Sequence, residues 1–134
     1  MAVIKRSAQS RNQDVLLAED EAMIRELIST YLTNLGFTVH ESVNGQDAVD
    51  KARGFGPGNL SLLITDIVMP KMGGMELAAA LRKENADLRV LFISGYTDDA
   101  VLLDDADRAH SAFLKQPFNF DALRNRVEAL LERA

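Results

Sequence analysis

Short apolar segments alternate with longer amphipathic segments along most of the chain. Five of them have the length and the bounding turn residues of β-strands, and they cover residues 14–18, 37–41, 60–66, 88–93 and 111–115. In the third, which ends on Asp66, four of the five residues from Leu60 to Ile64 are apolar, which is the pattern of a strand buried on both faces of a parallel sheet. We therefore expect a parallel sheet with Asp66 at the carboxyl end of its central strand.

The segments between these strands have the periodicity of amphipathic helices. Between residues 20 and 35 the apolar positions fall three and four apart and predict one buried stripe, made of Met23, Ile24, Leu27, Ile28, Tyr31, Leu32 and Leu35. Further helices are expected at 44–54, at about 74–85 and after Asn119, with asparagine N-caps on the first and the last. A helix at 97–108 is expected to be short or mobile, because its aspartates are weak helix formers.

Regular alternation of strand and helix predicts an α/β fold. We expect a flavodoxin-like three-layer (βα)5 sandwich whose parallel five-stranded sheet has the order 2-1-3-4-5. Residues 1–13 have no periodicity and are expected to form a flexible N-terminal arm, while residues 14–134 form one domain. In this strand order the ligand crevice lies between strands 1 and 3, which end at Glu19, Asp20 and Asp66.

Composition narrows the classes of function. The chain has 134 residues, a formal net charge of −5 and no cysteine. A nucleic-acid-binding surface would need a basic stripe, and a disulfide framework or thiolate zinc site would need cysteines. No apolar run approaches the ~20 residues of a membrane span, and residues 1–13 lack the apolar core of a signal peptide. We expect a cytoplasmic protein with no nucleic-acid or membrane partner.

Three carboxylates are predicted to meet at one edge of the sheet, namely Glu19, Asp20 and Asp66. Like charges ~4 Å apart repel by about 1 kcal/mol in water and by several times that at a protein surface, so such a cluster needs a cation. Mg²⁺ suits it, because this hard ion binds carboxylates, carbonyl oxygens and water. Zinc does not, because His40 and His110 lie away from the cluster.

The fourth and fifth strands end in groups that suit an anion. Ser94 offers a hydroxyl, and Gly95 leaves room for a backbone N–H to approach a ligand. Lys115 or Gln116 can donate from the end of the fifth strand. Together with a metal, these groups predict a phosphoryl-accepting site in which Asp66 is the nucleophile. Gly95 and Ile67 are the candidate cofactor-binding residues at this site.

Four segments resemble the receiver domain of two-component response regulators: Leu16–Glu21, Ile64–Pro70 with Gly73 and Gly74, Ile93–Gly95, and Phe113–Phe118. Each segment alone is a weak signal, but four in order at family-like spacing are specific. The resemblance covers roughly residues 14–132. It implies that Asp66 takes a phosphoryl group from the phosphohistidine of a histidine kinase or a histidine phosphotransfer protein.

The resemblance also implies roles for individual residues. Mg²⁺ would be held by Asp20, Asp66 and the Val68 carbonyl, and Glu19 would act through a metal-bound water. Ser94 would bond a phosphoryl oxygen after activation, and Phe113 matches the aromatic switch position on the fifth strand. A downstream protein would bind the face formed by helix 4, strand 5 and helix 5. The protein would be no enzyme in the usual sense, since it would catalyse only its own phosphoryl transfer and slow dephosphorylation.

One position departs from the family pattern. The family has a lysine immediately before the proline, but here Gln116 precedes Pro117 and Lys115 lies one residue early. Side chains alternate along a strand, so this register favours Gln116 in the site and directs Lys115 away from Asp66. A local backbone twist that brings Lys115 in is the other possibility. The Gln116–Pro117 peptide bond is expected to be cis by resemblance.

Two rival functions remain at this point. A phosphatase of the haloacid dehalogenase kind also uses an aspartyl nucleophile, but it places a second aspartate two residues later, where this chain has Val68. A degenerate receiver that acts as an unphosphorylated interaction module is favoured by Gln116 and opposed by the complete set of acids. The predicted function is therefore a phosphorylation-controlled switch of a two-component phosphorelay.

Overall fold

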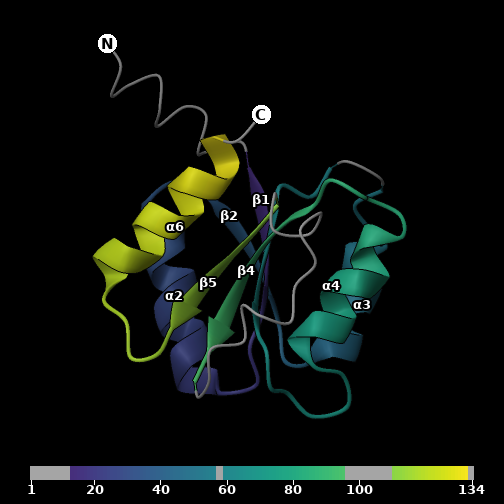
Figure 1. The fold of residues 1–134 in the computed structure, drawn as a ribbon, viewed down its shortest axis with the longest axis horizontal. Helices are drawn as coiled ribbons and strands as arrows, with labels where there is room; N and C mark the ends of the chain where they lie inside the picture. The colour runs from purple at the N-terminus through teal and green to yellow at the C-terminus, as the bar shows by residue number, and fades with distance from the viewer. Residues whose placement is uncertain (1–12, 57–58, 96–109, 133–134) are drawn as a thin grey trace.

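The computed structural model describes residues 13–56, 59–95 and 110–132. Five parallel strands form one sheet: β1 (Asp14–Ala18), β2 (Thr38–Ser42), β3 (Leu62–Asp66), β4 (Arg89–Ser94) and β5 (Ser111–Lys115). Their order is β2-β1-β3-β4-β5, which confirms the predicted topology. β1 and β3 are therefore neighbours, and because the strands are parallel both their carboxyl ends lie at the same edge of the sheet. This is the edge toward which the arrows of β4 and β5 point in Figure 1.

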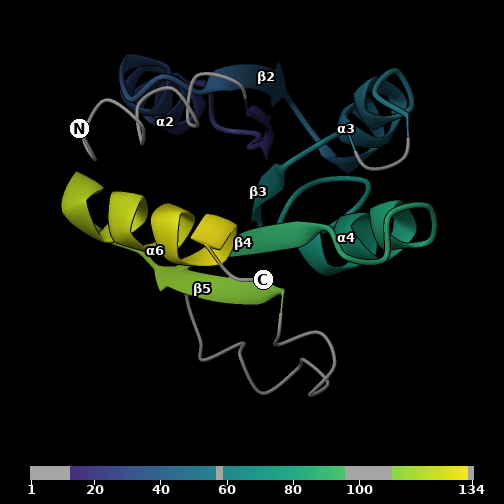
Figure 2. The same ribbon diagram turned by 90° about the horizontal axis from the view of Figure 1, so that it is seen from above.

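The helices form the two outer layers. α2 (Ala22–Asn34) and α6 (Phe120–Glu132) cover one face of the sheet, and α3 (Gly45–Ala52) and α4 (Gly74–Arg82) cover the other, as Figure 2 shows. Successive side chains of a strand point to opposite faces of the sheet, and so they form two apolar clusters. Leu17 packs on the side of α2 and α6, and Leu16 packs on the side of α3 and α4. The helix expected at 97–108 lies outside the described residues.

Local signals in the sequence placed several element ends correctly. Asn44 accepts a hydrogen bond from the Asp47 amide at 2.8 Å, and Asn119 accepts one from the Ala122 amide at 2.8 Å, so both predicted N-caps are confirmed. Gly36 follows α2 with φ 107, a conformation that glycine adopts readily. Where such signals are absent, the observed ends differ from the predicted ones by a few residues. β3 begins at Leu62 rather than at residue 60, and α2 begins at Ala22 rather than at residue 20.

The predicted buried stripe of α2 was wrong at two positions. Ile28 and Leu32 are buried, but Met23 is 74% exposed and Leu27 is 53% exposed. At about 100° per residue the predicted stripe spans about 180° of the helix circumference, which is wider than the strip that contacts a sheet. Met23 and Leu27 lie at one border of that arc, so they remain on the surface.

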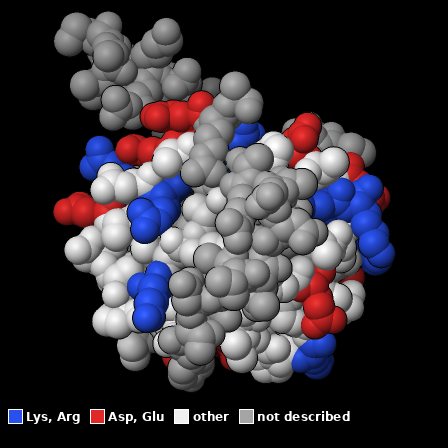
Figure 3. Space-filling view, in the orientation of Figure 1, with Lys and Arg blue, Asp and Glu red and all other residues white. Residues whose placement is uncertain are grey.

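The acidic excess of the chain does not separate the two signs of charge on the face that Figure 3 shows. On the face drawn in Figure 3, acidic and basic side chains are interspersed over the part of the chain that is described. This differs from the continuous basic stripe of a nucleic-acid-binding surface. The expectation that the protein has no nucleic-acid partner stays a prediction.

None of the helices in the described residues combines the length and the apolar character needed to cross a lipid bilayer.

Candidate functional site

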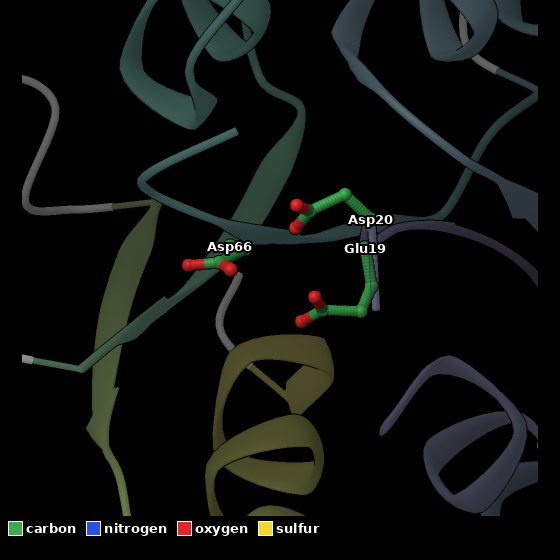
Figure 4. Close-up of side chains that lie close together, drawn as sticks. All are labelled: Glu19, Asp20 and Asp66. Carbon is green, nitrogen blue, oxygen red and sulfur yellow. The ribbon is translucent and has the colours of Figure 1, made fainter. Parts of the chain in front are cut away.

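The three predicted carboxylates converge at the carboxyl edge of the sheet. Glu19 and Asp20 follow β1, and Asp66 ends β3, whose penultimate residue pairs with Ala18. One carboxylate oxygen from each residue lies within 4.8 Å of the others. Figure 4 shows the side chains entering the same space from two neighbouring strands. The sequence therefore predicted this cluster correctly.

Burial makes the cluster electrostatically costly without a cation. Glu19 is fully buried, Asp66 is half-buried and Asp20 is exposed. Burial, with a smaller contribution from the nearby charges of Asp66 and Asp20, raises the pKa of Glu19 to about 7, while a hydrogen bond from the Glu21 amide opposes the shift. Burial also raises the pKa of Asp66, against the effect of the Val68 amide. A bound cation would relieve both effects.

The acids fit a hard divalent cation. Glu19 Oε2 accepts the Glu21 amide at 3.0 Å, whereas Glu19 Oε1 is buried with no hydrogen-bond partner in the described chain. The adjacent Asp20 carboxylate can form a hydrogen bond with this oxygen only when one of the two carboxyl groups carries a proton. An all-oxygen cluster that contains one buried oxygen without a donor, and no histidine or cysteine, matches the preferences of Mg²⁺. Glu19, Asp20 and Asp66 are therefore the residues that would hold the ion.

The loop after Asp66 is fixed by its backbone. The Ile67 amide donates to the Ile93 carbonyl at 3.1 Å, and the Ile67 carbonyl accepts the Gly74 amide at 2.8 Å. The Val68 amide donates to Asp66 Oδ1 at 3.3 Å, and the Val68 side chain is 64% exposed. The loop therefore presents the Asp66 carboxylate at the surface. The Val68 carbonyl as a metal ligand and Ile67 as a phosphoryl-binding residue stay predictions.

β4 and β5 bring further polar groups to this edge. Ser94 is 4% exposed, and its carbonyl accepts the Gln116 amide at 2.7 Å. Gln116 Oε1 lies 3.4 Å from the position that a β-carbon on Gly95 would occupy. Lys115, which pairs with Ser94 in the sheet, is exposed. The side-chain amide of Gln116 therefore lies over Gly95, as the predicted register favours.

The remaining expectations concern the end of the sheet. The Gln116–Pro117 peptide bond is cis, as expected. Phe113 is half-buried and stacks on Phe92, with 5.2 Å between ring centroids. Its backbone carbonyl accepts Arg126 Nε at 3.0 Å. A switch role for Phe113 stays a prediction, because one conformation does not test it.

Sequence analysis missed one residue at the site. Arg25, in the second turn of α2, donates from Nη1 to the Glu19 carbonyl at 2.8 Å. Its Nε lies 3.4 Å from Glu41 Oε1 on β2. The sequence offered one signal for this role: Arg25 lies on the flank of the apolar stripe, one helical turn before Ser29. A charged side chain at such a position more often lies in solvent, so the signal is weak.

Sequence comparisons place the chain among known proteins. Residues 15–128 match the family model of the response regulator receiver domain. The chain is 34% identical over 117 residues to the response regulator receiver protein CpdR of Brucella abortus, a match that covers 87% of this chain and 95% of that protein. It is 35% identical over 131 residues to the sensor kinase CckA of the same species, covering 98% of this chain but only 14% of the kinase.

Solved structures give the same result. The response regulator protein TrrA from Thermotoga maritima, in complex with Mg²⁺-BeF, superposes with a TM-score of 0.76 at 32% identity, covering 89% of this chain and 99% of that one. TrrA in complex with the histidine kinase ThkA superposes with a TM-score of 0.73, covering 90% and 99%. The shared strand order, the acidic cluster and the match over residues 15–128 lead to one conclusion: this chain belongs to the response regulator receiver domain family.

Proposed function

We propose that the chain is a phosphorylation-controlled signalling switch in which Asp66 accepts a phosphoryl group from a phosphohistidine. The observation that carries this proposal is the cluster of Glu19, Asp20 and Asp66, with a buried carboxylate oxygen that has no donor in the described chain. Asp66 ends β3 in a loop tied at Ile67, so its carboxylate is presented to an incoming group.

The transfer exchanges one bond for another. An oxygen of the ionised Asp66 carboxylate attacks phosphorus, the phosphorus–nitrogen bond breaks, and its electron pair returns to the imidazole of the donor. Mg²⁺, when bound, supplies positive charge that offsets the charge on the acids and on the phosphoryl oxygens. The Val68 amide, which donates to Asp66 Oδ1, helps to orient the carboxylate before the transfer.

Donors from β4 and β5 would then bind the phosphoryl group. The Ser94 hydroxyl, the Gly95 amide and the Gln116 side-chain amide would donate to the phosphoryl oxygens. Two observations support this: β4 pairs with β3 beside Asp66, and the Gln116 side chain lies over Gly95. Gln116 donates a hydrogen bond without a charge, so the switch lacks one ion pair that a lysine would form. A downstream partner would bind the face formed by β5, α6 and the helix that the sequence predicts at 97–108, and the protein would act in the cytoplasm.

An exposed apolar surface lies beside the site and suits the phosphoryl donor. We call the exposed side chains of Met23, Leu27 and Phe120, which are 74%, 53% and 38% exposed, the α2–α6 patch. Phe120 stacks on Tyr31 at 4.6 Å between ring centroids. A hollow of about 510 Å³ runs from Leu27 and Phe120 to Gly95 and Gln116. A helical protein that covers this patch would bring its phosphohistidine close to Asp66.

The kinase partner is supported by likeness to TrrA, which has been solved in complex with the histidine kinase ThkA. We propose that a histidine kinase or a histidine phosphotransfer protein packs on the α2–α6 patch. The exposure of large apolar side chains on an otherwise amphipathic helix is what singles this surface out.

The test is phosphorylation by a small phosphoryl donor, acetyl phosphate, in the presence of Mg²⁺. Intact-mass measurement should show the gain of one phosphoryl group, and the gain should disappear in Asp66→Asn and after removal of Mg²⁺ with a chelator. In amide NMR spectra recorded with Mg²⁺, addition of beryllofluoride should change the chemical shifts of Ser94 and Phe113. Binding of Mg²⁺ without any response to either reagent would favour the unphosphorylated interaction module.

A further inference from the structure

The guanidinium group of Arg25 connects three elements at the edge of the metal site. It donates from Nη1 to the Glu19 carbonyl at 2.8 Å and pairs through Nε with Glu41 Oε1 at 3.4 Å. The Arg25 side chain is only 15% exposed. An arginine on α2 therefore joins the loop after β1 to the neighbouring strand β2.

The Glu19 carbonyl lies where regular structure supplies no donor. The last residue pair between β1 and β2 joins Ala18 to Ser42. The first backbone bond of α2 runs from the Arg25 amide to the Glu21 carbonyl. Glu19 lies after the strand ladder and before the helix ladder, and a buried carbonyl in such a position needs a donor from a side chain or from water. Arg25 is that donor.

The hydrogen bond from Arg25 to the Glu19 carbonyl fixes the relative orientation of Glu19 and Asp20. The Glu19 carbonyl belongs to the peptide plane that joins Glu19 to Asp20, and such planes are rigid. The preceding plane, between Ala18 and Glu19, is held by the Glu19 amide, which donates to the Ser42 carbonyl at 3.2 Å. Rotation of the plane would turn the Asp20 carboxylate relative to Asp66. The Arg25 bond opposes that rotation.

The guanidinium group is itself held from β2. Ser29 Oγ donates to Glu41 Oε2 at 3.1 Å, so Arg25 and Ser29, one helical turn apart, bind the two oxygens of one carboxylate. Lys51 Nζ donates to the Glu41 backbone carbonyl. Glu41 is thus attached to both α2 and α3, and it anchors Arg25 with the Nη1 group directed at Glu19.

We propose that Arg25 is a positioning residue for the metal site, anchored by Glu41. This inference rests on the proposed function, because it takes Glu19, Asp20 and Asp66 as the Mg²⁺ ligands. Arg25 touches neither the ion nor the phosphoryl group. It acts by fixing the peptide plane from which two ligand side chains extend.

The test compares Mg²⁺ affinity across variants that remove one end of this connection. Arg25→Met removes both contacts, and we expect Mg²⁺ affinity measured by calorimetry to fall about tenfold, the lower end of the usual effect of groups that orient metal ligands. Arg25→Lys keeps a donor for Glu19 but loses the paired geometry with Glu41, so a smaller fall is expected. Glu41→Gln should give a fall of the same smaller size. Arg53→Met, which removes an exposed arginine paired with Asp50, is the charge-matched control.

Two further measurements separate positioning from general stability. The Glu21 amide reports the hydrogen bond to Glu19 Oε2, and its NMR signal should shift in the Arg25 variants without metal but stay unchanged in Arg53→Met. Unfolding in urea without Mg²⁺ gives the loss of stability. A Mg²⁺ affinity within twofold of the natural protein in Arg25→Met, or, if that variant does not fold, in both Arg25→Lys and Glu41→Gln, would overturn the inference. Absence of Mg²⁺ binding or phosphorylation in the natural protein would instead refute the proposed function.

Discussion

Gly74, the first residue of α4, lies directly against the backbone of Asp66. A β-carbon at Gly74 would be 2.3 Å from the Asp66 carbonyl oxygen and 3.1 Å from its carbonyl carbon. The start of a helix on one face of the sheet thus sets the position of the proposed phosphoacceptor. Only a residue without a side chain allows this contact.

Gly74→Ala should displace the Asp66 backbone, because the nearest atoms belong to main chain and cannot rotate away. We expect a loss of about 1–3 kcal/mol in the free energy of unfolding, together with weaker Mg²⁺ binding. Urea denaturation and calorimetry measure the two effects. Gly54→Ala is the matched control: its β-carbon would lie at 3.4 Å from the Lys51 carbonyl, so both quantities should change little. Equal effects of the two substitutions would contradict this account.

Stability without metal should fall as the pH rises between about 4.5 and 7. Burial first, and then the charges of Asp66 and Asp20, raise the folded-state pKa of Glu19 from 4.5 to about 7. Between these values the folded protein holds a proton that the unfolded chain releases, so deprotonation favours unfolding. The loss should be on the order of 2 to 3 kcal/mol. Urea denaturation at several pH values, with a chelator present, measures it.

Two controls test the assignment to Glu19. Glu19→Gln removes the titrating group, and its stability should depend much less on pH over this interval. Saturating Mg²⁺ should reverse the slope for the natural protein, because the ion binds ionised carboxylates and its affinity rises as they deprotonate. A pH dependence that survives unchanged in Glu19→Gln would place the titration elsewhere.

Gln116→Lys should strengthen the response to phosphorylation. The Gln116 side chain lies over Gly95, so a lysine there would bring an ammonium group to the phosphoryl oxygens of Asp66. We expect larger beryllofluoride-induced NMR shifts at Ser94 and Phe113 in this variant. Lys115→Ala, at an exposed position, should leave those shifts as they are. The opposite pattern, with the response lost on removal of Lys115, would mean that Lys115 is the residue in the site.

Leu27→Ser should impair transfer from a protein donor while sparing transfer from a small one. Leu27 is 53% exposed in the α2–α6 patch, so the polar residue removes apolar contact area without opening the core. The rate of phosphorylation by a histidine kinase should fall at least several-fold, whereas the rate with acetyl phosphate should stay the same. Val43→Ser, at another exposed apolar position (47%), is the control. Equal kinase rates in Leu27→Ser and the natural protein would remove the patch from the proposal.

The sequence by itself determined the strands, their order and the acidic cluster. Apolar strands that alternate with amphipathic helices leave few topologies, and in the order 2-1-3-4-5 the ends of β1 and β3 must meet. Glu19, Asp20 and Asp66 could therefore be placed together from residue positions alone. The caps at Asn44 and Asn119 were equally local, because a side chain that bonds an amide three residues later needs no distant partner.

The tertiary structure alone decided which apolar residues of α2 are buried and which partner its arginine contacts. Periodicity gives the angle of a side chain around the helix, but the width of the contact with the sheet depends on how α2 and α6 pack, so Met23 and Leu27 were wrongly assigned to the core. Arg25 lies near Glu41 only because β2 pairs with β1. Such a contact joins residues distant in the chain, and no local pattern encodes it.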